Sequence, residues 1–87
     1  MINNIFWEKL ATYCNENWKG KFSDRELKEH SQLYLDEWNY SKNTHKLSDT
    51  LVSLIEQLKE DMINDSLEAD TFLKEIYQEC EKFNIEI

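Results

Sequence analysis

A chain of 87 residues is long enough for one domain with a single modest core, and 40% hydrophobic residues exclude a disordered chain despite 32% charged ones. The net charge of −8 is unevenly distributed, because residues 1–44 carry six basic and seven acidic side chains, whereas residues 45–87 carry four and eleven. The acidic second half would repel a phosphate backbone, so we do not expect direct binding to nucleic acid.

No apolar run approaches the ~18 residues of a membrane span, and the N-terminal sequence lacks the pattern of a signal peptide. We therefore expect a cytoplasmic protein without membrane contact. Cys14 and Cys80 are too few for a disulfide framework and lie among apolar residues, so we expect both to be buried thiols.

The first predicted helix covers residues 4–18, where apolar residues recur at helical spacing. Either Asn3 or Asn4 can cap its start, because a short side-chain oxygen can accept from a free N–H of the first turn. Gly20 follows the last periodic residue and is the one glycine of the chain. We expect it to close this helix in a left-handed conformation.

The second predicted helix covers residues 24–41 and has the clearest local start signal in the sequence. Ser23 can accept from the N–H of Glu26 while the Glu26 carboxylate accepts from the N–H of Ser23, an arrangement known as the capping box. Phe22 precedes the cap and Leu27 follows at the fourth helical position, so this pair is spaced to form a hydrophobic staple.

Two further amphipathic helices are predicted over residues 47–64 and 66–83, the former with Thr44 or Ser48 as its cap. The alternation typical of strands never persists. The sequence therefore predicts an all-α fold, a small up-and-down helical bundle of about four helices, three long plus one, in a single domain over residues 1–87. The predicted interior consists of Phe6, Leu10, Cys14, Leu27, Tyr34, Trp38, Leu51, Leu54, Ile55, Leu58, Phe72, Leu73, Ile76 and Cys80.

The stretch EDMINDSLEAD, residues 60–70, contains five carboxylates and neither lysine nor arginine. A calcium loop of the EF-hand type would need a glycine at its sixth position, and none is present, so we do not predict calcium binding. Asp65 and Glu68 are instead spaced as a capping pair for the last helix. Glu60 and Asp61 are expected only to face solvent. The stretch is thus predicted to be the corner between two helices.

The sequence contains no assembled catalytic constellation. A single glycine excludes phosphate-binding loops and the nucleophile elbow. His30 and His45 are not spaced with any cysteine as zinc ligands, and the Glu-x-x-His motif of di-iron bundles does not occur. We therefore expect no enzyme activity, no cofactor and no metal.

Rows of carboxylates are one candidate surface for binding a partner. Glu56 and Glu60, like Glu75 and Glu79, lie one helical turn apart, a spacing comparable with that of phosphates along a strand. A protein that displays such rows could occupy a basic nucleic-acid groove of another protein. The alternative is that these residues form the solvated face of any amphipathic helix.

The second candidate surface lies on the second helix, off its main apolar face. Leu33, Glu37 and Tyr40 are spaced four and three residues apart there and could form a contact strip. Trp7 lies at one margin of its apolar stripe and is a further candidate for partial exposure. Half-burial against a chain terminus is the alternative for these residues.

The sequence favours a non-catalytic protein-binding module, an acidic inhibitor or accessory protein that acts on a basic partner surface. Small acidic helical chains also occur among immunity proteins and accessory proteins of phages and mobile elements, an association by size and charge alone. One alternative is a self-associating helical subunit of a larger complex, including a homodimer. The other is a small-molecule or enzyme subunit whose site forms on assembly, which a pocket of convergent polar residues would favour.

Overall fold

The computed structural model describes residues 2–19 and 22–87. This described part consists of four α-helices and one π-helical turn. The elements in chain order are α1 Asn4–Cys14, η1 Asn15–Lys19, α2 Asp24–Thr44, α3 Asp49–Ile63 and α4 Leu67–Lys82. The predicted all-α bundle of four helices is confirmed. The expectation that Gly20 closes the first helix lies outside the described residues.

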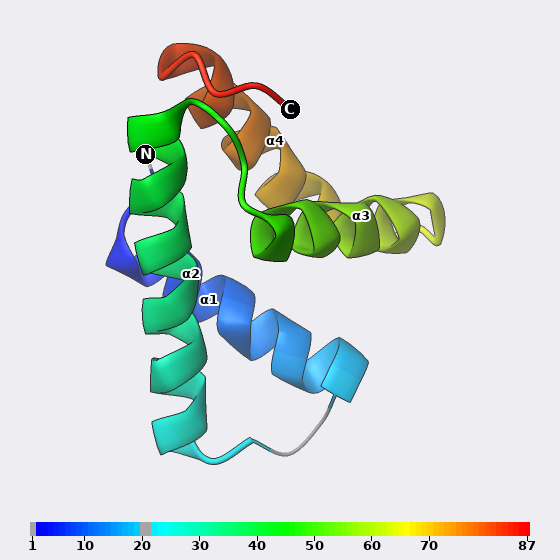
Figure 1. Ribbon diagram of the computed structural model, residues 1–87. Helices are drawn as coiled ribbons and strands as arrows, with labels where there is room; N and C mark the ends of the chain where they lie inside the picture. Colours follow the sequence, from blue (N-terminus) through cyan, green and yellow to red (C-terminus); the bar gives the residue numbers. More distant parts are fainter. Residues whose placement is uncertain (1, 20–21) are drawn as a thin grey trace.

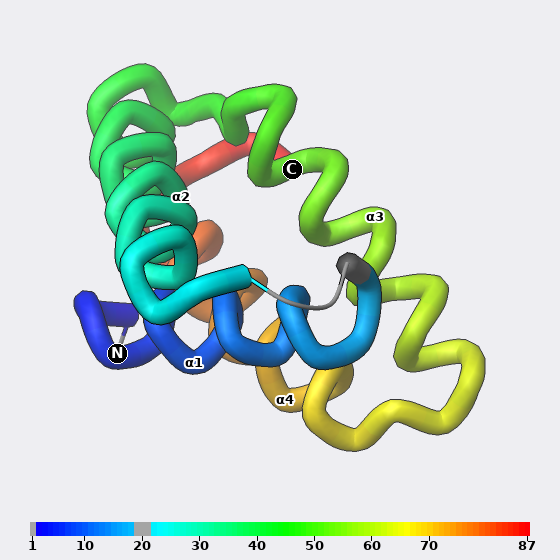
Figure 2. Tube along the Cα trace, turned by 90° about the horizontal axis from the view of Figure 1, so that it is seen from below, coloured from blue at the N-terminus to red at the C-terminus, as the bar shows by residue number. Residues whose placement is uncertain are grey.

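The helices are arranged as two pairs (Figure 1). Helix α1 packs against α2, and α3 packs against α4. In the view of Figure 1, α2 runs vertically and α3 horizontally, so the two pairs cross rather than lie along a common axis. The two pairs meet in two places. Helix α2 packs against α3. Helix α1 also meets α4, where the Phe72 ring contacts the rings of Phe6 and Tyr13, and these two helices are neighbours in Figure 2.

Side-chain oxygens define where the helices begin. The Asn3 side chain accepts from the N–H of Phe6 at 3.2 Å and caps α1. The predicted capping box between Ser23 and Glu26 is confirmed at the start of α2. Of the two candidate caps for the third helix, Ser48 is the one in place, with its hydroxyl accepting from the third helical N–H at 3.3 Å.

The first two helices differ from their predicted bounds, and polar side chains bond to the backbone near both differences. The first helix changes from α to π geometry at Asn15, where the Asn17 side chain donates to the carbonyl of Tyr13 at 2.9 Å. Helix α2 continues to Thr44, beyond the predicted end at residue 41, and the Thr44 hydroxyl donates to the Tyr40 carbonyl at 3.0 Å. His45, with φ 60°, closes α2 in the left-handed region.

The acidic corner between α3 and α4 is a tight backbone turn. Asp65 has φ 70° and donates its N–H to the carbonyl of Met62, while Ser66 donates its N–H to the carbonyl of Asp61, both at 3.0 Å. This pair of bonds is the Schellman motif that commonly ends a helix. The predicted corner is confirmed, but the predicted cap is wrong: Asp65 forms the left-handed turn, and the hydroxyl of Ser66 caps α4.

The core draws on all four helices, and most of the predicted interior is buried. Three predicted residues, Leu27, Tyr34 and Phe72, are only half-buried. Trp7 corrects the sequence interpretation, because its side chain is 0% exposed. The crossing of α1 and α2 covers the margin of the apolar stripe, so that the Trp7 ring lies 5.9 Å from the ring of Trp38. The predicted residues that are buried are Phe6, Leu10, Cys14, Trp38, Leu51, Leu54, Ile55, Leu58, Leu73, Ile76 and Cys80.

Both ends of the chain are fastened to distant segments. The N–H of Ile2 donates to the carboxylate of Glu79 at 2.9 Å, and the Ile2 side chain is buried. At the other end, Ile85 is buried and the N–H of Glu86 donates to the carbonyl of His45 at 2.8 Å. The C-terminal segment thereby closes over the connection between α2 and α3.

Candidate partner-binding groove

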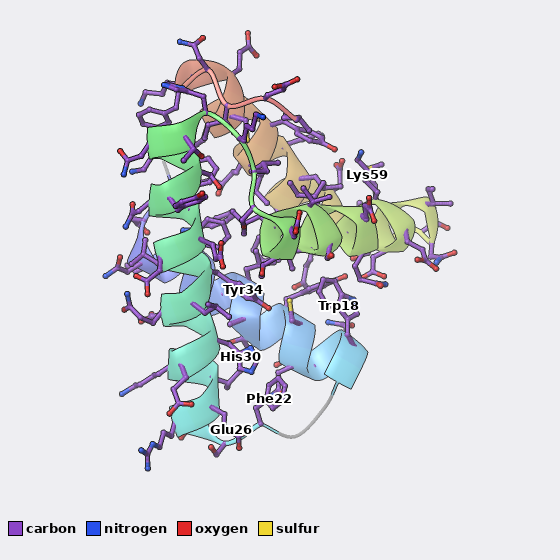
Figure 3. All side chains as sticks on the ribbon, viewed as in Figure 1. Trp18, Phe22, Glu26, His30, Tyr34 and Lys59 are labelled. Carbon is purple, nitrogen blue, oxygen red and sulfur yellow. The ribbon has the colours of Figure 1, made fainter. Side chains whose placement is uncertain are left out.

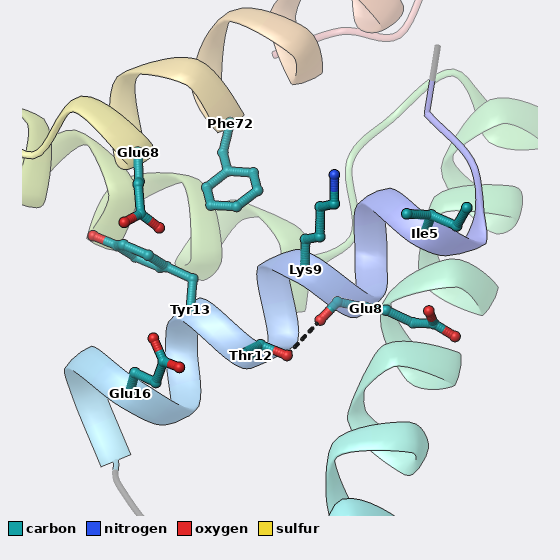
Figure 4. A pocket seen from close by; sticks show the side chains of 8 residues that line it. All are labelled: Ile5, Glu8, Lys9, Thr12, Tyr13, Glu16, Glu68 and Phe72. Carbon is teal, nitrogen blue, oxygen red and sulfur yellow. Dashed lines mark hydrogen bonds between the residues drawn. The ribbon is translucent and has the colours of Figure 1, made fainter.

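A groove runs between α1 and α4 (Figure 4). It consists of two adjoining cavities of about 480 Å³ and about 300 Å³ that share Ile5, Lys9 and Phe72 in their walls. We call it the α1–α4 groove. Its lining residues are Asn3, Ile5, Phe6, Glu8, Lys9, Thr12, Tyr13, Glu16, Glu68, Thr71, Phe72 and Glu75.

The floor of the groove is a row of aromatic rings packed edge to face. In the floor, the rings of Tyr13 and Phe72 and the rings of Phe72 and Phe6 have centroids 5.6 Å apart. Outside the groove, the Trp18 ring packs edge to face on the Tyr13 ring at the same distance. Edge-to-face pairs at this spacing favour one relative orientation of the rings. The floor is therefore apolar and rigid.

Tyr13 is held in this row by a chain of hydrogen bonds behind the floor. Its hydroxyl donates to the carboxylate of Asp61 at 2.7 Å and lies 3.1 Å from the hydroxyl of Ser66. Because the single Tyr13 proton goes to Asp61, the Ser66 hydroxyl is the donor to Tyr13. The cap of α4 and the end of α3 thus fix a side chain of α1. Burial raises the pKa of Tyr13, so the phenol stays protonated at neutral pH.

Asp61 is the centre of this chain, which corrects the expectation that it only faces solvent. The Trp18 indole N–H and the Tyr13 hydroxyl both donate to Asp61 Oδ2, and Gln57 approaches Oδ1 at 3.4 Å. Burial opposes ionisation of Asp61, but these donors outweigh it and lower the pKa of the carboxyl below its ordinary value. Asp61 is therefore ionised at neutral pH.

The walls of the groove are acidic. Four carboxylates, those of Glu8, Glu16, Glu68 and Glu75, and one cation, Lys9, line it. Figure 4 shows the Glu16 and Glu68 carboxylates on either side of the Tyr13 ring, with Lys9 reaching from α1 toward α4. None of these four carboxylates forms an ion pair with a cation among the described side chains. The groove therefore presents uncompensated negative charge around an apolar floor.

Apolar side chains are also exposed at the α3–α4 corner, next to Glu68. Ile63 is 76% exposed and Leu67 is 82% exposed. They lie within the acidic stretch, beside Glu60 and Asp65, which are also exposed. The corner thus combines apolar and acidic surface, as the groove does.

The structure separates the four glutamates predicted to form acidic rows. Glu56 and Glu60 are exposed on α3, and Glu75 is half-buried in the wall of the groove. The prediction that Glu79 belongs to a displayed row of carboxylates is wrong, because only 8% of the residue is exposed and its carboxylate accepts from the N–H of Ile2. Glu79 therefore holds the N-terminal segment in place.

The predicted strip on α2 is partly exposed. Leu33 is 45% exposed and Tyr40 is 61% exposed, whereas Glu37 is half-buried. None of the three lines the α1–α4 groove. Leu33 and Tyr40 are thus exposed side chains of α2 that lie outside the groove.

Sequence reasoning missed most residues of the groove. The apolar periodicity predicts that Phe72 belongs to the interior, and it does not single out Ile5, Glu8 and Glu16, which lie off the apolar stripe of the first helix. One signal was available: Ile5 is an aliphatic residue beside the stripe rather than in it. The neighbouring carboxylate Glu68 comes from α4, and periodicity within one helix does not show which helix will lie opposite.

The two cysteines are buried and protonated. Cys14 and Cys80 are buried, as predicted, and burial raises the pKa of their thiols to about 12 and about 11, so neither is a thiolate at neutral pH. In residues 2–19 and 22–87, no three His, Cys, Asp or Glu side chains are grouped so that they could hold a metal ion. None of the described helices is both long and apolar enough to cross a membrane.

Comparison of the chain with protein-family models, with curated proteins and with solved structures gives no match. A function for this protein is therefore inferred from the geometry of the groove.

Proposed function

We propose that this protein is a non-catalytic binding module that holds a basic, amphipathic segment of a partner protein in the α1–α4 groove. One observation supports this proposal above the others: an apolar floor lies between walls that carry four carboxylates and one lysine. A partner helix with one apolar face and lysines or arginines beside it matches both features. By occupying a basic surface of its partner, the module would act as an inhibitor or accessory protein.

The size of the groove suits a short helical segment. Helix α1 has 11 residues and is thus about 16 Å long at ~1.5 Å per residue. A partner helix of about three turns would lie alongside it, as in other recognition modes in which a helix fills an apolar groove. Ile5, which is 58% exposed at one end of the groove, would lose its contact with water on binding.

Charge favours a basic partner over a second copy of this chain. A symmetric dimer through this groove would place the acidic walls of one copy, with Glu16, Glu68 and Glu75, against the acidic walls of the other. The same holds for the acidic α3–α4 corner. Repulsion of this kind costs several kcal/mol when it is not screened. Self-association is therefore the weaker candidate, despite the exposed Ile63 and Leu67.

Site-specific cross-linking in host cells or lysate tests where a partner binds. A photoreactive amino acid replaces Ile5 in the groove or Tyr40 on the outside of α2, two positions with similar exposure of 58% and 61%. We expect the Ile5 position to capture a basic amphipathic segment, identified by mass spectrometry, and the Tyr40 position to capture none of it. Capture only from Tyr40 would assign binding to the strip on α2 and contradict the proposal.

Charge reversal tests the role of the carboxylates once the partner segment is known. We expect Glu68→Lys and Glu75→Lys each to slow association, because a long-range attraction becomes a repulsion. Glu81→Lys is the matched control: it makes the same charge change on an exposed residue of α4 that does not line the groove. An association rate that is equal in all three variants and flat across an ionic-strength series would rule out electrostatic steering.

A further inference from the structure

A separate cleft of about 550 Å³ lies between η1, α2 and α3. It shares no lining residue with the α1–α4 groove. Trp18 from η1, Tyr34 from α2, and Gln57 and Asp61 from α3 are among its walls. Figure 3 shows Trp18 projecting from η1 toward α3, and Tyr34 projecting from α2 into the space beside α1. We call it the Asp61 cleft.

Among the described residues that line the Asp61 cleft, Asp61 carries the one charge, and it is negative. The other described polar lining side chains are neutral, namely those of Asn17, Trp18, Tyr34, Thr50, Ser53 and Gln57. The volume lies within the range of about 300–1,000 Å³ that is typical of small-molecule sites. A ligand for this cleft should therefore be small and carry a positive charge.

The Oδ1 oxygen of Asp61 can accept a further hydrogen bond. Oδ2 already accepts from Tyr13 and Trp18, whereas Oδ1 has only the Gln57 amide at 3.4 Å. Good N–H···O hydrogen bonds are about 2.7–3.2 Å long, and an ionised carboxylate has about four lone-pair sites. No described cation forms an ion pair with Asp61. Oδ1 can therefore accept from a charged donor supplied by a ligand.

Two aromatic side chains also line the cleft: Trp18, which is bonded to Asp61, and Tyr34 from α2. Indole and phenol rings attract organic cations through their π faces. The bond from the Trp18 indole N–H to Asp61 fixes the orientation of the Trp18 ring. Trp18 belongs to the π-helical turn, and such turns frequently occur at functional sites. The carboxylate and the two rings thus come from three different elements and line the same cleft.

We propose that the Asp61 cleft binds an organic ammonium ion, whose N–H donates to Asp61 Oδ1 and whose alkyl part packs against Trp18 and Tyr34. The same chemistry is presented by a free alkylamine and by the side chain of a lysine in another protein. Neither source binds in the α1–α4 groove. A negative result for the amine would therefore not contradict the proposed function, and failure of the proposed function would not contradict this assignment.

Titration with two amines followed by NMR tests the site. n-Butylammonium represents the free amine, and Nα-acetyl-lysine methylamide represents the lysine side chain, both at constant ionic strength. We expect the indole N–H signal of Trp18 to shift saturably with one or both, and the tighter ligand identifies the source. Absence of a saturable shift, or an equal shift with sodium chloride, would overturn the proposal.

Two isosteric changes separate a specific site from general attraction to an acidic protein. Asp61→Asn removes the charge but keeps the shape, and we expect affinity for the amine to fall at least about tenfold. Glu60→Gln makes the same charge change at the exposed neighbouring residue and should leave affinity unchanged. An equal loss in both variants would show that net charge alone attracts the amine and would overturn the proposal.

A third variant keeps the test decisive if Asp61→Asn fails to fold. Gln57→Lys places an ammonium group one helical turn before Asp61, where it can occupy Oδ1 from within the chain. The variant should stay folded, because it adds a favourable charge pair, and it should no longer bind either amine. Unchanged binding to a folded Gln57→Lys variant would contradict the assignment of the ligand to Oδ1.

Discussion

Asp61 and Glu79 belong to amphipathic helices, and hydrogen bonds from distant parts of the chain hold both carboxylates. Asp61 accepts from Trp18 and Tyr13, which lie 43 and 48 residues away, and Glu79 accepts from Ile2, which lies 77 residues away. A carboxylate placed in this way is part of the fold, because removing it leaves buried donors without an acceptor. The effect of substituting an acidic residue on stability therefore depends on whether its carboxylate accepts such hydrogen bonds.

Asp61 should contribute to the pH dependence of stability. Its pKa in the folded protein lies below the ordinary value of 3.8, so the contribution is present above that value and is lost as the pH falls through the folded pKa. Asp61→Asn should therefore flatten part of the decline in the free energy of unfolding below about pH 4. Urea unfolding at a series of pH values measures this.

Glu60→Gln is the control for that experiment, because Glu60 is exposed and adjacent. Glu60→Gln should leave the decline in the free energy of unfolding below about pH 4 nearly unchanged. A decline that is as steep in Asp61→Asn as in the control would show that the hydrogen bonds to Asp61 do not depend on its charge.

Glu79 and Glu75 should respond differently to reversal of charge. Glu79→Lys leaves the N–H of Ile2 without its acceptor and places an ammonium group at a largely buried position, so the free energy of unfolding should fall by at least about 2 kcal/mol. Glu75→Lys should change it by less than about 1 kcal/mol. Chemical denaturation of both variants checks this, and similar losses would mean that the contact with Ile2 contributes little.

At the scale of elements, the α3–α4 corner joins three helices through one serine. The Ser66 hydroxyl accepts from the N–H of Ala69 to cap α4 and donates to Tyr13, which in turn donates to Asp61 at the end of α3. Chains of hydrogen bonds in which each group both donates and accepts strengthen one another. The cap of α4 and the position of α1 are therefore coupled.

Removing the hydroxyl of Ser66 should cost more than removing that of an isolated cap. Ser66→Ala loses both the cap and the bond to Tyr13, which together stabilise by about 2 kcal/mol. Ser23→Ala loses only an exposed capping box, about 1 kcal/mol. Thermal and chemical unfolding of the two variants compares them. Equal costs would contradict the coupling between the α4 cap and α1.

Sequence reasoning predicted the elements well and their contacts poorly, for a physical reason. The capping box at Ser23 and the cap at Ser48 involve residues three apart, so the sequence contains both partners of each bond. The burial of Trp7 depends on how α1 crosses α2, and the placement of Glu79 depends on the path of the N-terminal segment. No pattern within one helix encodes either.

The residues of the candidate groove likewise cannot be predicted from patterns within single helices. Of the seven residues predicted to bind a partner, only Glu75 lines it. The total charge could be read from composition, but which carboxylates share a surface depends on the meeting of α1 and α4. Sequence thus indicated an acidic protein that binds a basic partner, and the geometry supplied a different surface for that hypothesis.

At the scale of the whole molecule, the net charge of −8 should act on folding and on the proposed binding in opposite directions. Like charges on one compact surface repel one another and destabilise the folded state. The three ion pairs among the described residues each include a strongly exposed lysine or arginine and offset little of this repulsion. The same charge would draw a basic partner toward the protein.

Salt should therefore stabilise the fold while slowing association with a basic partner. Raising the ionic strength from about 0.01 M to about 0.15 M shortens the Debye length from about 30 Å to about 8 Å and screens both interactions. Circular dichroism should show a higher melting temperature, and binding kinetics a lower association rate. A melting temperature that falls with added salt would mean that attractive pairs outweigh the net repulsion.

The fastening of the two chain ends has a consequence for the order of folding. The pairs α1–α2 and α3–α4 join neighbours in sequence, so each can form after closure of a short loop. The bond between Ile2 and Glu79 closes a loop of almost the whole chain, and the entropic cost of closure grows with loop length. Contacts of this kind form late. The two helix pairs can thus assemble first and be locked together last, and unfolding can begin with release of the ends while both pairs are still intact.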